Sequence, residues 1–347
     1  MTKAVYLITN PFSTFHFGKY APDSDTSLGD SDIVFHSDTL FSSLIVTYTT
    51  LFDDTNDFVK QFDNGNIIIS SINYFLEFKN KVIHFLPKPV SFNLLETDDF
   101  KNFNKIAYVS KKIFESLNHP SDLLNDDIIF IQDIFAVYKS ELEGINNILL
   151  NKIKLVNNLV HQKVFVSKEM QGDDLYQRGI IEIADNSLID KNIKVGFYFL
   201  IETKSDFDNN FMEKFKIVLE VLQTNGIGGE KGNIGQFESF EIKEWSLNLN
   251  EIDENYKMSL SYINPDKSEI KKIKYGKTLL RGGRKIGSGN ELLKVIRLLE
   301  EGSLVNKGVK GTIADIKPEG WKGIPFLRYG KAFLIDINKN WLNNGTK

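Results

Sequence analysis

The stretch from Thr224 to Phe237, which reads TNGIGGEKGNIGQF, places five glycines in one short loop. Glycine loses more backbone entropy on folding than any other residue, so such a cluster needs positive-φ turns or a partner that approaches the main chain closely. Backbone NH groups in a concave loop can bind a phosphate, and a mobile hairpin connection is the alternative. The residues that would form such an anion site are Gly226, Gly228, Gly229, Lys231, Gly232, Asn233 and Gly235.

The position of this loop restricts the fold. Apolar residues at helical spacing predict a helix over Asn210 to Gln223 directly before it, and a strand follows at Phe237 to Ile242. Dinucleotide-binding and Walker folds have the reverse order, in which the glycine loop follows a strand and precedes a helix. These folds are therefore excluded, and the sequence also lacks the G-x-S-x-G pattern of many hydrolases.

The overall composition is that of an ordinary globular chain. Its 347 residues are 41% hydrophobic and 25% charged, which is enough material for two domains. The absence of cysteine excludes disulfides and thiol nucleophiles, and the five histidines show no metal-binding spacing, so we expect neither a metal nor a cofactor. The sequence shows no signal peptide or long apolar span, and a cytoplasmic location is expected.

Charge is distributed unevenly along the chain. The formal net charge of −4 argues against indiscriminate coating of nucleic acid, but basic residues gather between Lys267 and Lys285. A run of this kind is usually a solvated face. Whether it contacts RNA is left open by the sequence.

Both halves of the chain repeat one order of elements. The first half opens with a predicted strand over Ala4 to Thr9, a helix over His36 to Phe52, and strands over Asn66 to Phe78 and Lys81 to Phe85. In the second half, a strand at Ile193 to Ile201 precedes the helix and the strand that flank the glycine loop. This order is typical of a split βαβ unit, so we predict an α+β fold with two ferredoxin-like (RRM-like) domains in tandem.

We expect the first domain to span residues 1–188 and the second to span residues 189–347, with the glycine-rich loop at 224–237. The first domain would carry an inserted hairpin at about 155–185 and extra helices at Lys111 to Leu117 and Ile128 to Leu150. The apolar segment Leu292 to Leu299 is compatible with a helix or a buried strand. Further strands are predicted over Tyr256 to Ile263, Lys271 to Leu280, Gly311 to Ile316, Phe326 to Tyr329 and Ala332 to Ile337.

Two polar sites could carry chemistry. The first NH groups of the helix that starts at Ser37 or Asp38 could bind a phosphate, but Asp38 is better explained as a cap that occupies these groups itself. The hydroxyls of Ser37 and Thr39 would remain usable by an RNA. His16, in the sequence HFG, could be a general base for RNA cleavage, or a structural or RNA-contacting residue, because no second acid or base is identifiable.

Seven sequence blocks carry a resemblance to a known family. They are HFG at 16–18, HSDTLFSSL at 36–44, LPKP at 86–89, LYQRGIIEI at 175–183, the glycine loop, LLRGG at 279–283 and RYGKAF at 328–333. In this order they resemble the fourth subunit of the Csm complex, the type III-A CRISPR effector, which belongs to the RAMP superfamily. The blocks extend over nearly the whole chain, and SDTLF followed by LPKP is their most specific pair.

The resemblance implies a non-catalytic RNA-binding subunit with two ferredoxin-like domains and an inserted β-hairpin thumb. Such a subunit holds the repeat-derived 5′ tag of the CRISPR RNA (crRNA) and contacts the large polymerase-domain subunit and the first backbone subunit. The glycine loop and Lys231 would then grip phosphates without reading bases. The hairpin from His161 to Ile183 would be the thumb, which turns one nucleotide out of the strand, and Tyr176 could stack on a base or pack under the hairpin.

The segment QKVFVS at 162–167 departs from the family pattern, because relatives often carry an acidic residue and Arg-Leu-Thr-Gly there. Two alternative functions remain: a metal-independent RAMP endoribonuclease that processes repeat RNA with His16, and a scaffold whose glycine loop makes only subunit contacts. Besides the glycine-loop residues, the expected RNA contacts are His16, Gly18, His36, Ser37, Thr39, Lys88, His161, Tyr176, Arg178, Arg281 and Arg284.

Overall fold

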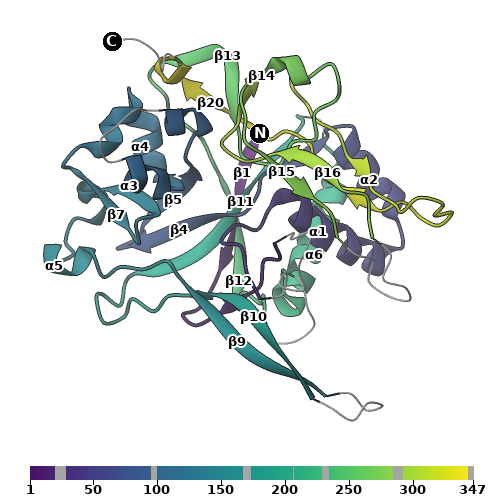
Figure 1. Ribbon diagram of the computed structural model, residues 1–347, viewed down its shortest axis with the longest axis horizontal. Helices are drawn as coiled ribbons and strands as arrows, with labels where there is room; N and C mark the ends of the chain where they lie inside the picture. Colours follow the sequence, from purple (N-terminus) through teal and green to yellow (C-terminus); the bar gives the residue numbers. More distant parts are fainter. Residues whose placement is uncertain are drawn as a thin grey trace.

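The computed structural model describes residues 1–19, 29–94, 100–166, 173–205, 207–228, 234–283 and 292–342. The chain has a mixed α/β architecture, with one large central sheet, helices against both of its faces and a long hairpin that extends away from the body (Figure 1). Among the helices of these residues, none combines the length and the apolar character needed to cross a membrane.

The central sheet has nine strands. They are β1 (Thr2–Ile8), β3 (Ile67–Ile69), β4 (Asn73–Phe78), β5 (Lys81–Pro87), β6 (Tyr108–Ser110), β7 (Ile128–Ile131), β8 (Phe135–Tyr138), β11 (Lys194–Thr203) and β12 (Ser239–Glu244). Their order is β12-β1-β11-β4-β5-β6-β8-β7, with β3 paired to β11. β1 is antiparallel to both of its neighbours, so that Tyr6 lies opposite Tyr198 and Glu241.

Both faces of this sheet are covered. Side chains alternate between the faces of a strand, so Val5 and Leu7 belong to one hydrophobic cluster and Ala4 and Tyr6 to the other. The first cluster includes residues of α1 (Ser37–Phe52), α2 (Thr55–Asp63) and α6 (Asn209–Asn225). The second includes residues of α3 (Phe100–Lys105) and α4 (Lys111–Ser116), together with the C-terminal Trp341. Burial on both faces explains the unbroken apolar run in β11.

Smaller sheets surround this core. The hairpin consists of β9 (Val156–Val166) and β10 (Asp173–Ile183), and β2 (Thr14–Phe15) pairs with the root of β10. Figure 1 shows the hairpin at the end of the molecule that lies farthest from the N-terminus. The remaining strands are β13 (Ile252–Ser259), β14 (Ile273–Tyr275), β15 (Thr278–Arg281), β16 (Ile296–Leu299), β17 (Leu304–Asn306), β18 (Ala314–Asp315), β19 (Leu327–Arg328) and β20 (Leu334–Asn338).

The short helices complete the chain. A single α-helical turn, α5 (Asn147–Leu150), precedes the hairpin. The 3₁₀ helices of the described residues are η2 (Val90–Leu94), η3 (Pro120–Leu124), η4 (Lys139–Leu142), η5 (Ile270–Lys272) and η6 (Lys339–Leu342).

The structure confirms the predicted mixture of helices and strands, but one predicted helix is wrong. The segment from Ile128 to Leu150 contains β7, β8 and only the short α5. Gln132 and Asp133, with φ of 55° and 59°, form a tight turn that pairs the two apolar runs as strands. Short apolar runs do not distinguish a buried strand from a helix. The segment Leu292 to Leu299 likewise contains the strand β16 and not a helix.

The central sheet takes strands from both sides of the domain boundary expected at residue 188. That position lies between β10 and β11, yet β11 pairs with β1 and β4 of the first half. β12, from the same side of the boundary as β11, pairs with β1 as well. The last two strands of the central sheet, β11 and β12, therefore follow the hairpin in the chain, while the hairpin itself belongs to a separate sheet with β2.

The base of the glycine loop closes on the chain itself. Gly226, Gly228 and Gly235 all have positive φ, between 85° and 94°. The amide of Ile227 donates to the carbonyl of Gly235 at 2.9 Å, and a Cβ atom on Gly226 would lie 2.6 Å from the carbonyl oxygen of Ile234. These glycines allow close approach of the protein's own backbone. Gly229, Lys231, Gly232 and Asn233, predicted as phosphate contacts, lie outside the described residues.

We expect Gly235→Ala to lower the free energy of unfolding by about 2–4 kcal/mol, because the new methyl group would overlap the carbonyl oxygen of Ile227 at a positive φ. Chemical denaturation measures this change. Gly65→Ala is the matched control: Gly65 also has positive φ, but its methyl group would meet open space. The control should cost only about 1 kcal/mol. Equal losses in the two variants would contradict the close approach.

Candidate nucleic-acid interface

The segment from Thr14 to Gly18 joins the hairpin root to the glycine loop. On one side, Phe15 pairs with Ile181 of β10. On the other, the amide of Gly235 donates to the carbonyl of Thr14 at 2.7 Å. Two regions that the sequence predicted separately as RNA contacts are thus held together by β2.

His16 lies inside this junction. The Nδ1 atom of His16 donates a hydrogen bond to the carbonyl oxygen of Gly179 at 2.7 Å, and Nε2 is the ring nitrogen that this bond does not use. The side chain is buried. A Cβ atom on Gly228 would come within 2.5 Å of the His16 carbonyl oxygen. A bulky residue at Gly228 would therefore displace β2, so such a variant tests the fold as well as RNA binding.

The hairpin has two chemically different faces. Residues directly opposite in its register share a face, and His161 lies opposite Arg178 while Lys163 lies opposite Tyr176. We call these four residues the basic face. The opposite face carries Val160, Gln162, Val164, Leu175 and Gln177. Lys163 was not among the predicted contacts. It lies two residues after His161 in the same strand, and this spacing indicates that the two side chains share a face.

The basic face is partly open to solvent. His161 is exposed, Lys163 and Tyr176 are half-buried, and Arg178 is buried near the root, 3% exposed. The outer part of this face can therefore contact an RNA. Arg178 is better placed to support the hairpin than to bind a ligand.

Asp38 does not cap α1. The N-cap residue is His36, whose side chain makes no capping hydrogen bond. The carboxylate of Asp38 is fully buried and accepts from Arg281 Nε at 3.0 Å and from Arg328 Nη1 at 2.5 Å. Burial raises the pKa of Asp38, but the charges of Arg281 and Arg328 outweigh it and hold this pKa well below its usual range.

Four predicted RNA contacts, Gly18, Ser37, Thr39 and Arg281, lie around Asp38 and make hydrogen bonds within the protein. Arg281, 7% exposed, also donates to Thr39 Oγ1 at 2.9 Å and to the carbonyl of Gly18 at 3.3 Å. The buried Ser37 hydroxyl accepts from the amide of Tyr262 at 3.0 Å. The side chains of Ser37 and Arg281 are therefore buried and hydrogen-bonded within the protein, and the hydroxyl of the half-buried Thr39 accepts from Arg281. Arg284 lies outside the described residues.

His36 lies between two carboxylates. Its Nδ1 is 2.9 Å from Glu301 Oε1, its Nε2 is 3.6 Å from Asp32 Oδ2, and its ring stacks on Tyr262 with centroids 4.1 Å apart. Burial lowers the pKa of His36, but the charge of Glu301 and the hydrogen bonds to both carboxylates raise it to about 9. The imidazole is therefore positively charged at neutral pH.

Lys88 faces the same cavity as His36. Its ammonium group donates to the carbonyl of Phe103 at 2.8 Å and lies 4.5 Å from the centroid of the Phe103 ring. Burial lowers the pKa of Lys88 to about 8. The cavity that the two residues line has a volume of about 470 Å³, so the sequence blocks HSDTLF and LPKP meet around one hollow.

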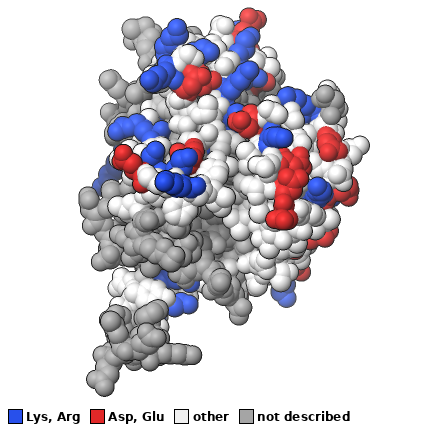
Figure 2. All heavy atoms as spheres, turned by 90° about the vertical axis from the view of Figure 1, so that its right-hand side faces the viewer, with Lys and Arg blue, Asp and Glu red and all other residues white. Residues whose placement is uncertain are grey.

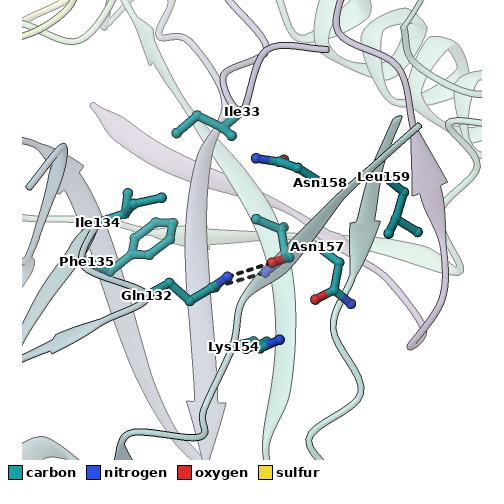
Figure 3. Close-up of a pocket in the computed structure, with 9 residues that line it drawn as sticks. Ile33, Gln132, Ile134, Phe135, Lys154, Asn157, Asn158 and Leu159 are labelled. Atoms are coloured by element: carbon teal, nitrogen blue, oxygen red, sulfur yellow. Dashed lines mark hydrogen bonds between the residues drawn. The ribbon is translucent and has the colours of Figure 1, made fainter. Parts of the chain in front are cut away.

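A second cavity, of about 370 Å³, lies at the hairpin root (Figure 3). Gln132, from the turn between β7 and β8, donates to the carbonyl of Val156 at 2.8 Å and accepts from the amide of Leu155 at 2.7 Å. Asn157, Asn158 and Lys154 add polar groups to this cavity. This cavity was not predicted from the sequence, because its walls come from separate segments. Gln132 fixes the point at which the hairpin leaves the body.

Charges of both signs are present on the face that Figure 2 shows. Lys and Arg are most frequent in its upper and left parts, where Asp and Glu lie among them, and a group of Asp and Glu lies on the right with Lys and Arg nearby. In the part of the chain that the structure describes, no group of three or more His, Asp or Glu side chains is arranged as metal ligands.

Comparison with known proteins finds relatives that match nearly the whole of this chain. Residues 253–337 match the family described as the CRISPR Csm4 C-terminal domain. A protein of Methanocaldococcus jannaschii described as CRISPR system Cms protein Csm4 is 31% identical, over 91% of this chain and 89% of the relative. A chain in the crystal structure of a Csm3-Csm4 subcomplex of a type III-A CRISPR-Cas interference complex is 26% identical, with a TM-score of 0.68, over 97% of this chain and 99% of that one.

A chain in the crystal structure of a Csm1-Csm4 cassette with cA3 has the same fold, with a TM-score of 0.53 at 18% identity, over 97% of this chain and 98% of that one. The fold is thus one found in subunits of type III CRISPR-Cas complexes. With 31% identity to a curated Csm4 over nearly its whole length, the chain belongs to the Csm4 family. The resemblance stated from the sequence blocks is confirmed.

We expect Asp38→Asn to destabilise the protein by about 3–5 kcal/mol, because the buried guanidinium group of Arg281 and the partly buried one of Arg328 would lose their shared counter-charge. Urea denaturation at neutral pH measures the loss. The control is Asp336→Asn, which breaks the exposed ion pair with Lys257 at 2.9 Å and should cost at most about 1 kcal/mol. A loss for Asp38→Asn as small as that of the control would show that the buried cluster is not a structural requirement.

Proposed function

We propose that the chain is a non-catalytic RNA-binding subunit of a type III-A CRISPR interference complex that holds the 5′ tag of the crRNA. The observation that carries this proposal is the meeting of the hairpin root and the glycine loop on β2. A strand of RNA could then contact the basic face of the hairpin and the backbone of the loop at one site. Phosphate contacts of this kind position an RNA without reading its sequence.

The tandem ferredoxin-like arrangement is part of the proposal. In chain order, β1, α1, β4, β11, α6 and β12 follow the β-α-β-β-α-β plan. We assign these elements to the first ferredoxin-like unit and treat the hairpin and the helices α3 and α4 as insertions between β4 and β11. The second unit would contain residues 253–337, the segment that matches the C-terminal family domain. This assignment moves the boundary from residue 188 to beyond Glu244.

The proposed partners follow from the family. The related solved structures are described as a Csm3-Csm4 subcomplex and a Csm1-Csm4 cassette. By analogy, this chain would join the large polymerase-domain subunit to the backbone subunits of a cytoplasmic complex in antiviral defence. Membership in the Csm4 family supports this role over that of an independent RNA-binding protein.

The alternative, a metal-independent endoribonuclease with His16 as acid or base, has a specific test. His16 is 4% exposed and its Nδ1 is engaged with Gly179, which fits a structural role. Repeat RNA incubated with the purified protein in EDTA should remain intact while it is bound. Denaturing gels measure this outcome. Cleavage that leaves a 2′,3′-cyclic phosphate and disappears in His16→Ala would establish the enzyme instead.

The two faces of the hairpin provide a matched test of RNA binding. We expect Lys163→Ala combined with Tyr176→Ala to weaken binding of tag RNA by about tenfold or more, because stacking on one aromatic ring contributes about 1–3 kcal/mol. The loss of Lys163 should also reduce the salt dependence of binding. Filter binding over a range of salt concentrations measures both effects.

The control changes the opposite face of the same two strands. Gln162→Ala combined with Gln177→Ala replaces a directly opposite pair in the same hairpin and should change the affinity less than about twofold. Thermal unfolding checks that both double variants are folded. Equal losses in the two variants, or no loss in either, would remove the basic face from the RNA-binding site.

A further inference from the structure

The turn that leads into β2 holds a phenylalanine in an unfavourable backbone conformation. In this turn, the amide of Ser13 donates to the carbonyl of Asn10 at 3.1 Å. Pro11 occupies the second position, and Phe12 occupies the third with a φ of 68°. A proline followed by a residue of positive φ is typical of a type II turn, whose third residue is usually glycine or asparagine. Phe12 is strained in this position, because its Cβ atom crowds the neighbouring carbonyl group.

Packing inside the protein does not explain a phenylalanine in this turn, because its side chain is 62% exposed. In the part of the chain that the structure describes, the other non-glycine residues with positive φ are all polar: Asp53, Lys79, Asn80, Gln132 and Asp133. Backbone strain of this kind is concentrated at functional sites. The turn therefore presents an aromatic ring to solvent at a cost in stability, which indicates a contact outside the chain.

The backbone around Phe12 is fixed to the root of the hairpin. The amide of Phe12 donates to the carbonyl of Ile183, the last residue of β10, at 2.9 Å. The amide of Ile183 donates in turn to the carbonyl of Ser13, also at 2.9 Å. The next residue along, Thr14, accepts from the amide of Gly235 at the base of the glycine loop. The ring of Phe12 thus starts from the junction of the hairpin and the glycine loop.

We propose that Phe12 stacks on a base of the RNA that is bound at this junction. The inference rests on the proposed function, since the RNA is the one that the hairpin and the loop would hold. A phenyl ring has no hydrogen-bonding group, so it matches a flat or apolar surface, and the bases are the flat groups of an RNA. Stacking of this kind tolerates any base. Phe12 thereby adds a base contact to the proposed phosphate contacts without adding sequence specificity.

Filter binding of oligouridine of about 12 nucleotides to the full chain tests this contact. Phe12→Gly should weaken binding by about tenfold, because the stacked ring is lost, whereas Phe12→Tyr should stay within about twofold of the unaltered protein. The salt dependence of binding should not change in Phe12→Gly, because a neutral ring neutralises no phosphate. In urea denaturation without RNA, Phe12→Gly should be at least as stable as the unaltered protein, since glycine suits the positive φ.

The matched control is Phe130→Ala, which removes an exposed phenyl ring from β7 and should change the affinity less than about twofold. If Phe12→Gly binds the RNA as tightly as the unaltered protein, RNA binding stands and the stacking role is wrong, which leaves the ring to a protein partner. A marked loss of stability in Phe12→Gly would also overturn the proposal, because the ring would then have a structural role. If the unaltered protein does not bind the RNA, the proposed function is wrong and this inference falls with it.

Fluorescence separates contact with a base from contact with the RNA backbone. In Phe12→Trp, oligouridine should quench the fluorescence of the new indole by stacking on it. The unaltered protein, which carries the same three natural tryptophans, gives the background. An abasic sugar-phosphate chain of the same length, at a concentration that saturates the protein, should cause no additional quenching. Equal quenching by the two chains would overturn the proposed stacking on a base.

Discussion

The buried carboxylate of Asp38 ties together parts of the chain that are far apart in sequence. Arg281 and Arg328, 243 and 290 residues further along, both donate to it, and Arg281 also reaches the carbonyl of Gly18. The start of α1, the strands β15 and β19 and the segment after β2 are thereby held in one arrangement. One carboxylate faces two guanidinium groups, so replacing Asp38 leaves the buried Arg281 without a counter-charge, whereas replacing either arginine leaves Asp38 paired with the other. The hydrogen bond from Arg281 to Gly18 connects this cluster to the segment that follows β2.

Residues in and around this cluster stabilise the fold and can be distinguished from residues that are accessible to a ligand. The blocks HFG, HSDTLF, LLRGG and RYGKAF each contribute to it or to its direct neighbours. Most of their polar side chains therefore make hydrogen bonds or ion pairs within the protein. The outer part of the hairpin's basic face, with His161 exposed and Lys163 and Tyr176 half-buried, remains accessible to a ligand. The proposed RNA binding is compatible with the net negative charge of the chain, since only local charge and backbone donors are needed.

Much of the fold could be predicted from periodicity. The apolar spacing of α1 and α6 and the alternation in the hairpin were sufficient, because these elements have one clearly buried face. The role of Asp38 could not be predicted from the sequence, because a carboxylate at a helix start is usually a cap and the two arginines that bind Asp38 are remote in sequence. The pairing of β11 and β12 with β1 was not predicted for a similar reason, since both strands return to β1 only after a long insertion. At the candidate site, His161 and Tyr176 were predicted as RNA contacts from the sequence. That they share one face of the hairpin with Lys163 depends on the pairing register of the two strands, which only the structure shows.

The hairpin's division into two faces restricts how its length can vary. Side chains in paired strands alternate with a period of two, so a shift of one residue in both strands would exchange the basic face with the face of Val164 and Leu175. The root prevents such a shift, because β2 pairs with β10 and Gln132 binds the start of β9. Insertions near the root that keep the two faces in place must therefore add residues in twos to each strand. Members of the family whose thumbs differ in length near the root should therefore differ there by even numbers of residues per strand, or carry a β-bulge that restores the alternation.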